Sequence, residues 1–208
     1  ALQEADGDFD KAVELLREKG LAKAAKKAGR IAAEGMVCAK VCAECGVAGM
    51  IEVNSETDFV AKNADFQKFV SDLADVVMQE NPADVDALKA CKMGDLTVEA
   101  ALQEKVLTIG ENIQLRRFVR YDESTVNVSY THMGGVIGVL VGLEVSDNLK
   151  GNATVLELGK DIGMQAAAMN PAFMDKSDVD EATLAKEKEI LLIQALEENK
   201  TAAKPKRE

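Results

Sequence analysis

Three cysteines near the start of the chain have a spacing that could support metal chemistry. Cys38, Cys42 and Cys45 form the pattern C-x3-C-x2-C, and cysteine thiolates are the ligands of iron–sulfur clusters. In enzymes with this signature an aromatic residue usually precedes the last cysteine, whereas this chain has Glu44 there. The three cysteines instead lie in a predicted short hairpin with Gly46, where they would be small apolar strand residues and a thiol in the turn. We therefore expect three free thiols and no bound metal; a metal-dependent enzyme built on this cluster is the first alternative.

The single histidine, His132, does not complete a recognisable catalytic group. A lone histidine is weak evidence for acid–base chemistry, and no serine or cysteine nucleophile stands in a known motif with it. Strand alternation aligns it with Val126, Val128 and Tyr130, so a partly buried structural histidine is a competing interpretation. The sequence also lacks a phosphate-binding loop of the form G-x-x-x-x-G-K-[ST]. These patterns predict a protein that is not an enzyme and binds no cofactor.

The charge balance favours a protein partner over a nucleic acid. The 208 residues carry a formal net charge of -11 at pH 7, which disfavours a broad phosphate-binding surface. Aromatic residues make up 4% of the chain, so few side chains can stack on bases. No apolar run is long enough to cross a bilayer, and the cytoplasm is the expected compartment. A ribosome-bound or RNA-binding module is the second alternative.

Apolar periodicity predicts helices and strands in a mixed order. The spacing of Phe9, Ala12, Val13 and Leu16 predicts a helix that ends at Gly20 as its C-terminal cap. Residues 21–29 are expected to be a solvated linker. The further expected elements are strands at 36–41 and 48–54, a loop at 55–60, a helix from Asn63 to residue 80, a helix from Thr97 to Gly110, strands at 113–121, 126–132 and 136–143, and a charged helix from Ser177 to about Asn199.

The second half of the chain repeats the pattern of the first. Shifting the sequence by 89 positions (135 − 46) places Gly46 and Gly49 on Gly135 and Gly138 without a gap. In this register the apolar helix positions also coincide, namely Phe69 with Leu158, Leu73 with Ile162 and Val77 with Ala166. A strand followed by a packed helix therefore occurs twice. The repeat predicts an α+β fold of two related subdomains with antiparallel sheets and packed helices.

One loop of this repeat differs between the copies. Phe59 is a large apolar residue between a strand and a helix, where it would suit a hydrophobic slot of a partner. Burial in the protein's own core is the competing interpretation. The repeat aligns Thr57–Val60 with Ser146–Leu149 and places Asn148 at the position of Phe59. Because the second copy has no aromatic residue there, we expect Phe59 to face a partner.

Three motifs give the chain a specific resemblance to a known family. They are Asp6-Gly7-Asp8 with AAKKAG at 24–29, EVNSETDFVAK at 52–62, and IGENI at 109–113 with Arg116 and Arg117. In their order and spacing over essentially the whole chain, they resemble bacterial elongation factor Ts. The resemblance implies that the chain is truncated at both ends, because family members have a complete ubiquitin-associated-like helical domain at the N-terminus and a returning arm with a closing strand at the C-terminus.

The resemblance also implies a function, that of a guanine-nucleotide exchange factor for the translation GTPase elongation factor Tu. In the family, the segment that enters the GTPase beside its magnesium site, displaces Mg²⁺ and promotes GDP release corresponds to Thr57, Asp58, Phe59 and Val60. Ile109 and Gly110 correspond to further contacts with the same GTPase domain, and His132 to a contact from the second subdomain. The implied partner is elongation factor Tu, in its GDP-bound and nucleotide-free forms.

The expected organisation has four parts. Residues 1–30 would be the remnant of the ubiquitin-associated-like helical domain with a linker, and 31–123 the N-terminal core subdomain. Residues 124–175 would form an incomplete C-terminal core subdomain, and 176–208 the first arm of a protruding helical hairpin. Lys204–Arg207 is expected to form the turn at which the second arm begins.

Overall fold

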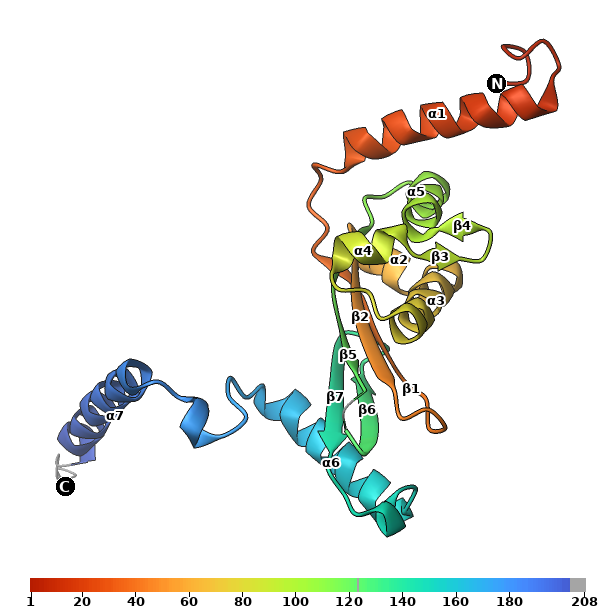
Figure 1. Ribbon diagram of the computed structural model, residues 1–208. Coiled ribbons are helices and arrows are strands. Elements are labelled where there is room, and N and C mark those ends of the chain that lie inside the picture. Colours follow the sequence, from red (N-terminus) through yellow and green to blue (C-terminus); the bar gives the residue numbers. More distant parts are fainter. Residues whose placement is uncertain (123, 203–208) are drawn as a thin grey trace. The chain divides into compact units, whose positions relative to one another are not determined.

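The structure, a computed structural model, describes residues 1–122 and 124–202 of the chain (Figure 1). The chain divides into two compact units, Ala1–Ala168 and Met169–Glu208. The boundaries expected at residues 30, 123 and 175 stay predictions. Within the described ranges, no helix is long and apolar enough to cross a membrane.

A three-stranded antiparallel sheet lies at the centre of the first unit. In this sheet β2 (Ala48–Ser55) pairs with β1 (Glu34–Val41) on one side and with β5 (Gln114–Tyr121) on the other. Side chains of β2 alternate between the two faces, and Ile51 and Val53 are fully buried on one of them. The three strands predicted from the sequence are confirmed, with small shifts at their ends.

Helix α3 (Ala64–Glu80) covers the buried face of this sheet. The side chain of Asn63 accepts hydrogen bonds from the backbone N–H groups of Asp65 and Phe66 and so caps the helix. Apolar residues at helical spacing fall on one face of α3. The buried ones are Phe66, Phe69, Val70, Leu73, Ala74, Val76 and Val77. They include the predicted apolar helix positions Phe69, Leu73 and Val77.

Shorter elements complete this half of the unit. α2 (Asp58–Ala61) is a single helical turn after β2, and its first three residues belong to the segment 55–60 that the sequence predicts as a loop. After α3 come α4 (Val85–Ala90), β3 (Lys92–Met93), β4 (Leu96–Thr97) and α5 (Val98–Ile109). Thr97 caps α5, and Gly110 ends it with a φ of 87°, a conformation that glycine adopts at little cost. The sequence does not predict α4, because its six residues are too few to reveal a period.

A second hairpin and helix repeat the first. β6 (Val126–His132) and β7 (Ile137–Leu143) pair antiparallel and are followed by the turn η1 (Asp147–Leu149) and by α6 (Ala153–Met169). The shift of 89 positions carries α3 onto α6 end to end, since 153 − 64 and 169 − 80 both equal 89. The same shift carries the start of α2 onto the start of η1. The predicted α+β fold with two related copies of a hairpin followed by a helix is confirmed.

The two copies contact each other through the second hairpin. The backbone N–H of Val37 in β1 donates to the carbonyl of Gly135 at 2.7 Å. A Cβ atom at Gly138 would press on Val37 and Met50, so the missing side chain lets the two hairpins approach closely. The β6–β7 hairpin therefore lies on the face of the first sheet opposite to α3.

Helix α1 (Phe9–Lys27) is longer than the sequence predicts. Asp8 caps its start through a hydrogen bond from the N–H of Lys11. The predicted end at Gly20 and the predicted linker at 21–29 are wrong, because the helix continues through Gly20. This glycine is buried, and a Cβ atom there would collide with Leu107 of α5. Gly20 thus permits close packing of two helices instead of ending one.

The second unit carries the turn η2 (Lys176–Asp178) and helix α7 (Glu181–Ala202). Asp180 accepts a hydrogen bond from the N–H of Thr183 and caps α7, so the helix begins four residues after the predicted Ser177. Its exposed apolar residues are Leu184, Ile190, Leu191, Leu192, Ile193 and Leu196. The turn predicted at Lys204–Arg207 lies outside the described residues.

Candidate partner-binding site

The turn α2 holds two neighbouring apolar residues in opposite environments. Phe59 is 80% exposed, whereas Val60 is 7% exposed and belongs to the hydrophobic core. Val60 therefore anchors the turn while Phe59 points away from the core. Burial of Phe59 in the protein's own core, the competing interpretation of the sequence, is wrong.

The carboxylate of Glu111 fixes the base of this turn. Its Oε2 accepts hydrogen bonds from the backbone N–H groups of Glu56 and Thr57, each at 3.0 Å, and its Oε1 accepts one from the Thr57 hydroxyl at 2.7 Å. Hydrogen bonds to an ionised acceptor are stronger than those between neutral groups. The loop after α5 is thereby joined to the segment after β2, although Thr57 and Glu111 are 54 positions apart.

The carboxylate of Glu56 joins the same two segments in the opposite direction. It lies on the segment after β2 and accepts a hydrogen bond from the loop after α5, and we call the place where the two segments meet the junction. Glu56 Oε1 accepts a hydrogen bond from the N–H of Asn112 at 2.6 Å and lies 3.5 Å from the Arg30 guanidinium. Asn112 is buried and donates from its side chain to the Arg30 carbonyl at 2.7 Å. Lys27, at the end of α1, donates to the carbonyl of Gly110 at 2.6 Å. Three segments that are distant in sequence therefore meet beside α2.

Asp58 adds a charge next to the exposed ring. It pairs with Lys62 at 2.6 Å, and the hydrogen bond from this ammonium lowers the pKa of the Asp58 carboxyl. The carboxyl is accordingly ionised at neutral pH. The turn presents an apolar tip beside the Asp58–Lys62 ion pair.

The other predicted contact residues occupy two places. Ile109 is half-buried and Gly110 is exposed, and both directly precede Glu111, so they lie beside the turn that carries Phe59. His132 lies in another element, at the end of β6, where it is exposed and its Nδ1 is 2.9 Å from the Tyr130 hydroxyl. The alternative of a partly buried structural histidine is therefore wrong.

Sequence reasoning did not single out the supporting carboxylates, Glu56 and Glu111. A signal was present, because Glu56 directly precedes Thr57 and Glu111 directly follows Gly110. Two acidic residues flanking two predicted contact segments are suited to accept backbone N–H groups from each other's loop. The sequence does not show, however, that the two loops meet.

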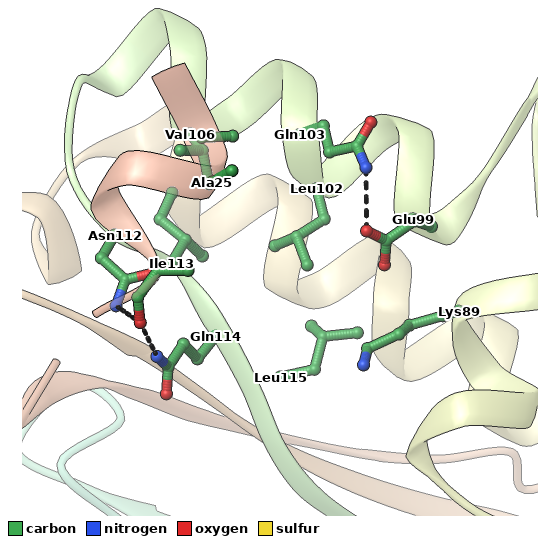
Figure 2. Close-up of a pocket in the computed structure, with 12 residues that line it drawn as sticks. Ala25, Lys89, Glu99, Leu102, Gln103, Val106, Asn112, Ile113, Gln114 and Leu115 are labelled. Carbon is green, nitrogen blue, oxygen red and sulfur yellow. Dashed lines mark hydrogen bonds between the residues drawn. The ribbon is translucent and has the colours of Figure 1, made fainter. Parts of the chain in front are cut away.

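A pocket of about 610 Å³ adjoins this junction, between α1, α5 and β5 (Figure 2). Its wall includes Leu102, Val106 and Leu115, and two further lining residues, both on α5, are joined by a hydrogen bond that the Gln103 side chain donates to Glu99 at 2.9 Å. Asn112 is common to the pocket and to the junction. The described lining offers apolar surface and hydrogen-bonding groups.

The cysteines differ from expectation. Cys42 and Cys45 form a disulfide, while Cys38 and Cys91 are free, so the prediction of three free thiols is wrong for this pair. The β1–β2 hairpin brings the two Cα atoms to 5.6 Å, within the range that a disulfide spans. No group of three or more His, Cys, Asp or Glu residues suited to a metal ion occurs among the described residues.

Comparison with known proteins identifies the family. The family model described as Elongation factor TS matches residues 56–206. The chain is 49% identical to the elongation factor Ts of Clostridioides difficile (strain 630) over 204 residues, which cover 97% of this chain and 66% of that protein. It is 48% identical to the elongation factors Ts of Syntrophotalea carbinolica and Clostridium perfringens (strain SM101 / Type A), in each case over 96% of this chain and 66% of the relative. The chain thus spans about two thirds of the length of these relatives, and it belongs to the elongation factor Ts family.

Proposed function

We propose that the chain acts in translation elongation as a guanine-nucleotide exchange factor for elongation factor Tu, in the cytoplasm. The observation that carries this proposal is the Phe59 ring, exposed at the tip of a turn that Val60 and Glu111 hold from below. Aromatic side chains that fill a partner's pocket commonly dominate the binding energy of an interface. Membership of the elongation factor Ts family supports the choice of partner.

The turn is suited to act as a wedge because it is held in position before it binds. Glu111 accepts hydrogen bonds from the backbone N–H groups of Glu56 and Thr57 and from the Thr57 hydroxyl. Glu56 in turn accepts one from the backbone N–H of Asn112. A preorganised turn loses little conformational entropy on binding, so more of its contact energy is available to act on the partner. Ile109 and Gly110 would contact the GTPase beside the wedge, and His132 would form a separate contact.

Exchange then follows from thermodynamic linkage. If the chain binds the nucleotide-free GTPase more tightly than the GDP-bound form, GDP must bind the complex more weakly by the same factor. Insertion of Phe59 beside the magnesium site, with Asp58 next to it, would displace Mg²⁺ and supply this difference. Loss of the cation removes positive charge from the phosphates of GDP. GTP with Mg²⁺ would then expel the factor. In this mechanism the chain contributes shape and charge, and no group of its own reacts.

Release of a fluorescent GDP analogue from purified elongation factor Tu tests the proposal. We expect release to accelerate with increasing concentration of the chain, and excess Mg²⁺ to oppose the acceleration. An unchanged release rate would contradict the exchange function, provided that the chain is shown to be folded by circular dichroism. Binding without acceleration would also contradict it, because the linkage argument requires tighter binding to the empty GTPase.

A further inference from the structure

We propose that Cys42 and Cys45 form a thiol-exchange site, at which a low-molecular-weight thiol reversibly opens the disulfide by attacking Cys45. The pair lies in the loop between β1 and β2, at the end of the hairpin remote from the strand residues that lead into α2. The inference is independent of the proposed nucleotide-exchange function, because neither cysteine belongs to the candidate partner-binding site.

The hairpin holds the two sulfur atoms near each other by its backbone. The last strand pair is Val41 with Ala48, and the N–H of Cys42 continues the ladder by donating to the carbonyl of Val47 at 2.8 Å. The carbonyl of Cys42 accepts from the N–H of Gly46 at 3.0 Å, and Gly46 has a φ of 70°. These bonds do not involve sulfur, so the loop keeps the two cysteines within reach after the disulfide opens.

The two sulfurs are not equivalent. Cys45 is exposed, whereas Cys42 is half-buried. The backbone N–H of Cys45 donates to Cys42 Sγ at 3.2 Å, and a hydrogen bond of this kind stabilises a thiolate. Thiol–disulfide exchange is fastest when the attacked sulfur is accessible and the departing thiolate is stabilised. Both conditions assign the attack to Cys45 and the departure to Cys42.

An open groove beside the disulfide gives a thiol room to approach. The groove has a volume of about 750 Å³, and its lining includes Lys40, Met78 and Ser129 as well as both cysteines. Lys40 is paired with Asp75 at 2.6 Å in the same groove. The groove is therefore large enough to admit a small peptide thiol, and both polar and apolar groups line it.

The remaining cysteines serve as internal references. Burial raises the pKa of the Cys38 thiol and that of the Cys91 thiol. A thiol with a raised pKa is largely protonated at neutral pH and a poor nucleophile. Reactivity toward thiols and disulfides is thus expected at Cys42 and Cys45 and not at Cys38 or Cys91.

The exchange balances in two steps. The thiolate of the small thiol attacks Cys45 Sγ, a mixed disulfide forms with Cys45, and the electron pair of the broken bond leaves on Cys42 Sγ, which takes up a proton. A second thiolate attacks the small-thiol sulfur of the mixed disulfide and releases Cys45 as a thiolate, which is protonated in turn. The protein gains two electrons and two protons, and two small thiols become one disulfide. Oxidation by that small disulfide is the reverse sequence.

Site-resolved alkylation tests the pair as it exists in the chain. The protein is equilibrated with mixtures of reduced and oxidised glutathione, quenched with iodoacetamide and analysed by peptide mass spectrometry. As the mixture becomes oxidising, we expect two of the four cysteines to lose alkylation together, Cys42 and Cys45. Alkylation of both at every ratio, or pairing of either with Cys38, would overturn the proposal.

Single variants test the direction of attack. With oxidised glutathione, Cys42→Ser should accumulate one glutathione on Cys45, and Cys45→Ser should form the mixed disulfide on Cys42 more slowly. The Cys38→Ser variant, as a matched control, should retain the redox response of the parent chain. Equal or faster modification of Cys42 would refute the assigned direction, and no mixed disulfide on either variant would refute the site.

Discussion

The two hairpin-and-helix copies of this chain share a backbone and differ at the tip of one turn. In each copy an asparagine caps a helix of 17 residues, Asn63 for α3 and Asn152 for α6. An aspartate–lysine pair accompanies both turns. The first turn presents Phe59, and the second has Asn148 at the equivalent position. Both copies form a helical turn here, α-helical in α2 and 3₁₀ in η1. A helical turn therefore forms in the second copy without an aromatic residue, which supports a role of Phe59 in binding.

The copies also differ in how completely their helices are buried. Phe69 and Leu73 of α3 are 2% and 0% exposed, whereas their counterparts in α6, Leu158 and Ile162, are 54% and 40% exposed. A third strand and α5 complete the core of the first copy, while the described second sheet has two strands. The first copy therefore has the more completely buried core, and the exposed turn is anchored to that core through Val60.

The largest effect should distinguish the two cores. Leu73→Ala removes a fully buried side chain and should lower the free energy of unfolding by about 2 to 5 kcal/mol. The matched change Ile162→Ala, at a partly exposed position, should lower it by about 1 kcal/mol or less. Urea denaturation followed by circular dichroism measures both. Equal losses would show that α6 is buried as fully as α3.

The exposed tip should matter for binding and little for folding. Phe59→Ala should weaken the complex with elongation factor Tu by about 2 kcal/mol, the scale of an interface anchor, and slow GDP release at sub-saturating concentration. Asn148→Ala, in the other copy, should change neither quantity. A core phenylalanine would instead lower the free energy of unfolding by about 3 to 5 kcal/mol. A large drop in the melting temperature of Phe59→Ala would contradict its assignment as a wedge.

The support of the first turn should be weaker without the Glu111 charge. Glu111→Gln keeps one acceptor oxygen but loses the ionised carboxylate, and should lower the free energy of unfolding by about 1 to 2 kcal/mol. Amide hydrogen exchange at Glu56 and Thr57 should accelerate, and exchange in the turn around Asn148 should not change. Unaltered protection of the Thr57 amide would show that Glu111 does not hold the turn.

The smallest effect concerns the charge pair at each turn. Lys62 lowers the pKa of Asp58, and Lys150 lowers that of Asp147, each chiefly through a hydrogen bond to the carboxyl. A depressed pKa in the folded state contributes stability above the unfolded-state pKa, and this contribution is lost as the pH falls through the folded-state pKa. Lys62→Met should raise the pKa of Asp58 alone, as followed by carboxyl NMR titration. If the pKa of Asp147 also rose in this variant, the two ion pairs would not be independent of each other.

Much of the fold could be predicted because its patterns are local. Side chains alternating at period 2 mark the strands, and the apolar face of α3 recurs at helical spacing, so both were found from the residues themselves. The sequence alone mispredicts Gly20, because a glycine that ends a helix and a glycine that touches another helix look the same in sequence. The candidate site was found only in part: Phe59 stood out by its type and its missing counterpart, whereas the carboxylates that hold its turn did not.

The sequence by itself determined the family, the internal repeat and the residue at the tip of each turn, since all three depend on residue identity and order. Only the tertiary structure decided that Phe59 is exposed, that Glu111 accepts the N–H groups of a loop 54 positions away, and that Cys42 and Cys45 are bonded. The physical reason is that burial and long-range hydrogen bonds depend on which distant segments meet. A local pattern fixes what a residue can do, and the packing of the whole chain fixes which neighbour it does it with.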